Sequence, residues 1–149
     1  MTEPTGRKVT VIRRDEGRTV HVVGDTYRLL GLGGDTDRQY FMMESITPPG
    51  GGPPPHYHTR EEEGFYVLEG EIEFRAGDEV IVGRAGTFVN IPKNLTHSFK
   101  NVGDQPARML VFCAPAGIED FFVEADGQGP DVVIAAATRY GIHILPPPE

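Results

Sequence analysis

Two histidines separated by one residue, His56 and His58, are the residues of this sequence whose types and spacing point most directly to chemistry. In an extended strand alternate side chains leave the same face and each residue rises about 3.3 Å, so the two imidazoles would lie about 6.6 Å apart on one face. Two rings at that separation can converge on one ion. His97 follows later in the chain, and an acidic run, Glu61 to Glu63, comes shortly after His58. Three imidazoles and one carboxylate suit a borderline divalent metal ion.

The carboxylate that joins the histidines is less firmly indicated by spacing alone. Glu63 stands five residues after His58, an odd offset that places it on the opposite face of a straight strand. It can reach the histidines only if the chain bends between Thr59 and Glu62. Adjacent strand residues face opposite ways, so one of Glu62 and Glu63 faces inward, and we expect the rest of the acidic run, including Glu61, to be solvated. If Glu63 is the inward residue, alternation sends Phe65 and Val67 inward and Tyr66 and Leu68 outward.

Glycines and prolines flank these residues at regular intervals. The first stretch reads Gly, five residues, His, one residue, His, four residues, Glu, six residues, Gly, and the second reads Gly, five residues, Pro, followed by His and Asn. The two stretches resemble the two motifs of the cupin family. That family has glycine two residues after the proline, where this chain has Asn94. Asn tolerates left-handed backbone geometry better than other residues with a side chain, so we predict a positive φ at Asn94. The matching positions are Gly50, His56, His58, Glu63, Gly70, Gly86, Pro92, His97 and Asn101.

The cupin resemblance implies an all-β fold, a double-stranded β-helix or jelly-roll barrel with one or two short C-terminal helices. It also implies one divalent transition metal ion inside the barrel, bound by His56, His58, Glu63 and His97. No thiolate is offered, so Fe, Mn, Ni, Co, Cu and Zn all remain possible. Glu62 would fit a shorter motif spacing that the family allows. Many single-domain cupins are dimers, so we expect a homodimer.

The segments FYVLEGEIEF and GIEDFF are similar to those of single-domain quercetin 2,3-dioxygenase-like cupins. This similarity implies a metal-dependent dioxygenase that cleaves a small aromatic, flavonol-like or enol-type substrate, with Glu63 as both ligand and catalytic base. Two other functions remain open: a non-enzymatic metal-binding or small-molecule-binding cupin, and a metal-dependent isomerase of a sugar-type substrate. We expect the substrate pocket to be lined by Phe65, Val67, Phe99, Phe121 and Phe122.

The rest of the chain reads as one domain with a β-rich body and a helical end. Residues 1–6 are expected to form a loose tail, residues 7–115 the barrel, and residues 116–149 a helical extension. Short apolar runs separated by Gly and Pro predict the strands. They lie at residues 8–13, 20–23, 27–30, 39–47, 64–68, 71–75, 79–82, 87–91, 96–102 and 108–114. Helical spacing then appears at Ile118, Phe121, Phe122 and Ala125, and again at Val133, Ala136, Ala137 and Tyr140.

Composition limits the possible partners. The chain has 149 residues, a net charge of −8 and a single cysteine, Cys113. An acidic balance disfavours nucleic acid, and one cysteine forbids an intrachain disulfide. The first residues lack the apolar core of a secretory signal, and the apolar runs are too short to span a bilayer. We therefore expect a cytoplasmic protein with a small-molecule substrate and no membrane partner.

Overall fold

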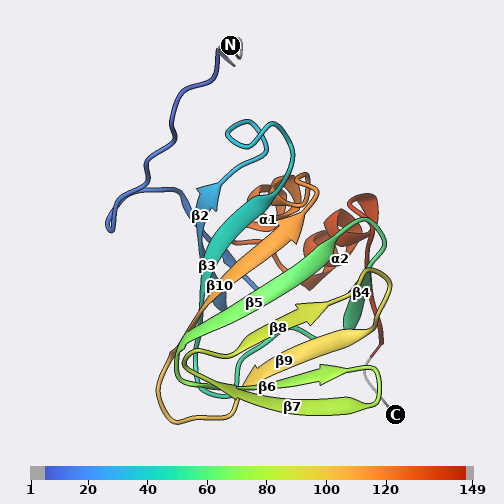
Figure 1. Ribbon diagram of the computed structural model, residues 1–149. Helices are drawn as coiled ribbons and strands as arrows, with labels where there is room; N and C mark the ends of the chain where they lie inside the picture. The colour runs from blue at the N-terminus through green and yellow to red at the C-terminus, as the bar shows by residue number, and fades with distance from the viewer. Residues whose placement is uncertain (1–5, 147–149) are drawn as a thin grey trace.

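Two antiparallel sheets face each other across a buried core in the computed structural model of the chain, which describes residues 6–146 (Figure 1). One sheet has six strands in the order β1-β2-β3-β10-β5-β8, and the other has five in the order β11-β4-β9-β6-β7. This is a jelly-roll fold, as predicted. The elements are β1 (Thr19–Val22), β2 (Asp25–Gly31), β3 (Phe41–Thr47), β4 (His56–His58), β5 (Glu62–Glu69), β6 (Glu71–Ala76), β7 (Glu79–Arg84), β8 (Phe88–Ile91), β9 (His97–Asn101), β10 (Ala107–Ala114), α1 (Glu119–Ala125), α2 (Pro130–Arg139) and β11 (Ile142–Ile144).

Alternation of apolar and polar residues determines which face of each strand meets the core. In β5, Glu63, Phe65 and Val67 are buried while Glu62 and Tyr66 are exposed, so the predicted inward set is confirmed. β10 is the central partner of this sheet, because it pairs with both β3 and β5. The interior is filled by large side chains from both sheets, among them Phe41, Met43, Phe65, Ile72, Phe74 and Met109.

The two predicted helices are present and close one end of the barrel. α1 buries Phe121, Phe122 and Ala125, and α2 buries Val133, Ala136 and Ala137. Gly141 follows α2 with a φ of +77°, a left-handed conformation that suits the residue after a helix end. The chain then forms β11, which pairs antiparallel with β4. The sequence did not predict this three-residue strand, and it lies directly beside the histidine-bearing strand.

One predicted strand is wrong. Residues 8–13 alternate in the sequence but form no strand, and Val9 and Val11 are exposed. Alternation stabilises a strand only where one face packs on the core, and residues 8–13 are exposed throughout, so they do not pair with the open edge of β1. Residues 1–5 of the expected tail and residues 147–149 lie outside the described part of the chain. Within residues 6–146 no helix has the length and apolar character needed to cross a membrane.

Candidate metal centre

The four predicted ligands come together from both sheets. His56 and His58 lie on β4, His97 lies on β9 directly opposite His56, and Glu63 projects from β5 of the other sheet. One potential ligand atom from each residue lies within 4.8 Å of the others. The ring centroids of His56 and His97 are 4.4 Å apart, and those of His56 and His58 are 4.9 Å apart. The strand pairing thus brings together side chains that are distant in sequence.

Backbone carbonyls orient two of the imidazoles. His56 Nδ1 lies 2.9 Å from the Pro54 carbonyl oxygen, and His97 Nδ1 lies 2.9 Å from that of Leu95. When Nδ1 donates its proton to the carbonyl, Nε2 keeps a free lone pair for the centre of the cluster, as in metal-bound histidines. His97 Nε2 is 2.9 Å and His58 Nε2 is 3.3 Å from Glu63 Oε1. The nitrogens therefore converge on the carboxylate.

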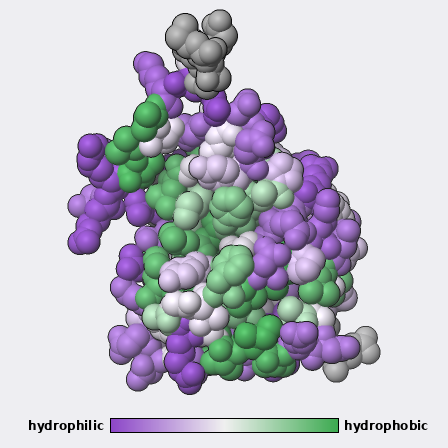
Figure 2. All heavy atoms as spheres, viewed as in Figure 1, coloured by the Kyte–Doolittle hydropathy of each residue, from purple (hydrophilic) through white to green (hydrophobic). Residues whose placement is uncertain are grey.

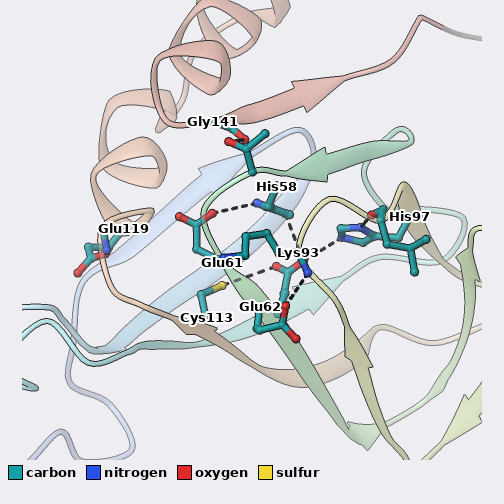
Figure 3. A network of polar contacts seen from close by, with 12 residues as sticks. His58, Glu61, Glu62, Lys93, His97, Cys113, Glu119 and Gly141 are labelled. Carbon is teal, nitrogen blue, oxygen red and sulfur yellow. Dashed lines mark hydrogen bonds and ion pairs between the residues drawn. The ribbon is translucent and has the colours of Figure 1, made fainter.

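A bend after His58 turns Glu63 inward, and it also buries Glu61. The expectation that Glu61 is solvated is wrong: it is 3% exposed, and its Oε1 lies 3.6 Å from His58 Nδ1 (Figure 3). The bend is covered by the end of α2, because the backbone N–H and the hydroxyl of Thr59 both donate to the Gly141 carbonyl. Glu62 lies outside, as predicted with Glu63 inward, and accepts a hydrogen bond from the Lys93 backbone N–H at 2.6 Å.

The second motif supports the same bend. Asn94 has a φ of +72°, which confirms the predicted left-handed conformation. Its backbone N–H donates to the His58 carbonyl oxygen at 2.8 Å. The turn between β8 and β9 is therefore tied to the strand that carries two of the histidines. Asn101 acts in a separate turn, where its side chain bonds the backbones of Thr47, Gly103 and Gln105.

Burial and mutual charge set the protonation of the cluster. Burial disfavours a charged His58, but the Glu63 carboxylate and the nearby Glu61 outweigh it and raise the pKa of His58 to about 10. Burial, and then the neighbouring His97, lower the pKa of His56 to about 4. Burial would raise the pKa of Glu63, but His58 and His97 hold it well below its usual range. Without a metal, an ionised Glu63 is balanced by a proton on His58.

This donor set fits a divalent transition metal ion. Both ring nitrogens of His58 are buried and lack a hydrogen bond of ordinary geometry, a state that is costly unless another partner is supplied. The 3.6 Å contact with Glu61 is an ion pair, too long for a hydrogen bond. A cation bound among the three imidazoles and Glu63 would replace the proton held between His58 and Glu63.

Cys113 is not part of this donor set. Its Sγ donates to Glu63 Oε2 at 3.8 Å, and burial raises the pKa of its thiol, so it remains protonated.

A cavity of about 80 Å³ opens beside the cluster between the two sheets and the helices. It is smaller than the roughly 300 to 1,000 Å³ of pockets for drug-sized ligands and suits a molecule of about one ring. Four of the predicted pocket residues, Phe65, Phe99, Phe121 and Phe122, are among its lining residues. Val67 is not. It is fully buried further along β5, where it lies opposite Met109 and packs into the core.

Two polar lining residues were missed by the sequence analysis. Asp25 and Tyr27 on β2 face the cavity and are both buried. The sequence did contain a signal for them. Asp25, Tyr27 and Leu29 alternate with outward residues, so a carboxylate stands on the otherwise apolar inner face of β2. No motif includes these residues, and only the packing of β2 against the helices and β3 brings them to the cavity.

Comparison with known proteins agrees with this geometry. Residues 43–113 match the family model for the cupin domain, so this part of the chain is a cupin domain. The chain is 35% identical over 71 residues to the polyketide synthase CurC of Streptomyces cyaneus, covering 48% of this chain and 46% of that protein. It is 28% identical over 119 residues to quercetin 2,3-dioxygenase of Bacillus subtilis, covering 80% of this chain and 35% of that protein. The chain thus spans less than half the length of either curated relative.

A solved structure shows the same fold. A protein of Thermotoga maritima described as a predicted oxalate decarboxylase superposes with a TM-score of 0.67 and 20% sequence identity. The match covers 70% of this chain and 98% of that one. At that identity the likeness concerns the fold. Together with the family match over residues 43–113, it shows a cupin-type jelly-roll fold, whose inner face holds a possible metal site.

Proposed function

We propose that this protein is a metal-dependent cupin dioxygenase that acts on a small aromatic or enol-type substrate. The observation that carries this proposal is the cluster of three histidines and Glu63 opening onto an otherwise mainly apolar cavity. The similarity to quercetin 2,3-dioxygenase supports it. The size of the cavity favours a substrate of about one ring over a complete flavonol.

The residues of the chain would divide the work as follows. His56, His58, His97 and Glu63 would hold the metal ion, which when bound supplies Lewis acidity and a site for O2. In the metal-free cluster His58 and His97 keep Glu63 ionised, and a bound cation would do the same, so its carboxylate would be free of a proton and could accept the hydroxyl proton of the substrate. The aromatic lining, which includes Phe65 and Phe99, would hold the substrate ring and exclude water. In a dioxygenation, both atoms of O2 then enter the cleaved product.

The proposal is tested by metal analysis followed by O2 uptake. Protein purified without chelators should contain about one transition metal ion per chain. It should consume O2 with at least one of catechol, hydroquinone, acetylacetone as an enol, and quercetin. His97→Ala should lose both metal and O2 uptake. His21→Ala is the matched control, since His21 is exposed and bonded to Thr26 away from the cluster. Full metal content in His97→Ala would refute the four-ligand site.

The two alternatives predict different results. Bound metal with no O2 uptake from any of these compounds would favour a non-enzymatic binding protein. An isomerase of a sugar-type substrate would need several polar and basic side chains facing the cavity, yet the described lining residues include no Lys or Arg. Beyond the proposed ligands, the polar lining side chains are Asp25 and Tyr27. The lining therefore favours a largely apolar substrate over a sugar-type one.

We also propose that two copies associate through the outer face of the six-stranded sheet. Tyr66, Phe88 and Phe112 are 42%, 64% and 42% exposed on the adjacent strands β5, β8 and β10. Figure 2 shows apolar atoms gathered over the middle of the face that Figure 1 presents. Such a patch on one sheet face can meet its own copy across a two-fold axis.

Light scattering after size exclusion tests this association. Wild type should elute as a dimer, and Phe88→Glu should shift it toward monomer. Val80→Glu is the control, because Val80 is 56% exposed on β7 of the other sheet and should leave the dimer intact. A monomeric wild type would refute the proposal.

A further inference from the structure

The cavity has a second polar group of side chains besides the metal cluster, the pair Asp25 and Tyr27. Asp25 is 2% exposed and Tyr27 is 7% exposed, and both line the cavity. The Tyr27 hydroxyl donates to Asp25 Oδ2 at 3.1 Å, and the Tyr27 ring packs against Phe122 with centroids 4.9 Å apart. The pair belongs to β2, which is separated from β5 by β3 and β10. It therefore lies on a different part of the cavity wall from Glu63.

Asp25 has an unmet hydrogen-bonding demand. Its Oδ1 is buried and makes no hydrogen bond. The Thr47 side chain lies near enough to lower the pKa of Asp25, but the Thr47 hydroxyl is itself without a hydrogen bond of good geometry. Burial is the stronger influence and raises the pKa of Asp25 to about 6. A buried carboxylate oxygen without a donor destabilises a fold, and such groups in native proteins call for an explanation.

The Asp25 carboxylate is bonded differently from two buried polar side chains that fix the backbone of this fold. Glu119 accepts hydrogen bonds from the backbone N–H groups of Gly33 and Gly117, and Asn101 bonds three backbone positions. Among the hydrogen bonds of residues 6–146, the Asp25 carboxylate accepts one, from the Tyr27 hydroxyl. Its second oxygen, Oδ1, accepts no hydrogen bond, and the Asp25 side chain is part of the cavity wall.

We propose that Asp25, held by Tyr27, binds a hydrogen-bond donor on the substrate at the opposite side of the ring from the metal-binding oxygen. This inference rests on the proposed function and narrows the substrate class. The substrate is then a compact, mainly apolar molecule of about one ring. It carries an oxygen for the metal at one end and an O–H or N–H group at the other. Specificity arises because an analogue without the second donor leaves the buried carboxylate unpaired.

A matched pair of phenols tests the proposal. Hydroquinone and 4-methoxyphenol share the ring and the first hydroxyl, but the second has a methyl ether in place of the distal O–H. Isothermal titration calorimetry with metal-loaded wild type should give at least about 10-fold tighter binding of hydroquinone, the scale of one unpaired buried group. Asp25→Asn should abolish that preference. In this variant the single side-chain oxygen at position 25 accepts the hydrogen bond from the Tyr27 hydroxyl, so the NH2 group faces the cavity.

Controls separate recognition from folding. Asp78→Ala removes an exposed turn carboxylate and should keep the wild-type preference. Asp25→Asn should melt at or above the wild-type temperature, because it removes a buried unpaired charge. A large fall in melting temperature with an unchanged preference would show that Asp25 is structural. Equal binding of the two phenols by wild type, or binding of neither, would also overturn the inference.

The same preparations distinguish this inference from the proposed function. Protein without stoichiometric metal would refute the proposed function. Metal-replete protein that binds hydroquinone equally well with and without Asp25→Asn would refute the role of Asp25 alone. Asp25→Ala provides a second variant that also removes the acceptor and should likewise lose the preference.

Discussion

Replacing Glu61 with glutamine should weaken metal binding, although Glu61 is not a proposed ligand. Its Oε1 lies 3.6 Å from His58 Nδ1, and both side chains are buried. The carboxylate favours a proton on Nδ1, which directs the Nε2 lone pair of His58 toward the centre of the cluster. Glutamine keeps the shape and removes the charge. The change therefore tests the electrostatic support of the ligand with little change in packing.

The size of the effect follows from this geometry. Loss of a partner that orients a metal-bound histidine typically lowers metal affinity by about 10- to 100-fold. The contact is longer than a hydrogen bond, so we expect about 10-fold, which corresponds to about 1.4 kcal/mol. Glu62→Gln is the matched control at the next residue. Glu62 is exposed and points away from the cluster toward the Lys93 backbone (Figure 3). The metal affinity of Glu62→Gln should therefore equal that of wild type.

The assay is a competition titration of chelator-treated protein with Zn²⁺ or Co²⁺ against a chromophoric chelator, at fixed pH. Circular dichroism of each variant checks that the fold is intact. A Glu61→Gln affinity equal to that of wild type would refute the reasoning. An equal loss in Glu62→Gln would also refute it, because the effect would then follow from the net charge of the run and not from the contact with His58.

Three further predictions follow from the cluster and its supporting turn. Glu63→Gln should lower O2 uptake by about 10²- to 10⁴-fold per bound metal, since an amide can still coordinate but cannot accept a proton; a fall no greater than the loss of metal would contradict a base role. In metal-free protein, the folded-state pKa of His58 is about 10 and its unfolded value is about 6.5, so its stabilising contribution is complete below pH 6.5 and is lost as pH rises toward 10. Melting temperature should fall over that range in wild type but much less in His58→Gln. Asn94→Gly should be nearly neutral, whereas Asn94→Val should lose about 1 to 2 kcal/mol in denaturant unfolding, because a β-branched residue poorly tolerates a φ of +72°; equal stability of the two variants would show that the turn relaxes.

The proposed metal ligands were predictable from the resemblance of the two motifs, and part of the information that places them is local. His56 and His58 alternate within one strand, and Glu63 begins the alternation that also buries Phe65. The proline and asparagine before His97 define the turn that precedes β9. Strand periodicity and turn chemistry act over a few residues, so spacing alone predicts which side chains share a face.

Long-range packing decided what surrounds those ligands. The bend after His58 is bonded through Thr59 to Gly141, which follows α2, and Glu61 in that bend is buried. β11 pairs with one edge of β4, whereas residues 8–13 form no strand, because they are exposed throughout and no packing against the core holds them to the open edge of β1. Asp25 reaches the cavity because β2 packs in the sheet beside β3. Burial and strand pairing depend on residues far away in the sequence. A local pattern therefore determines on which face of a strand a side chain lies, but not which part of the protein packs against that face.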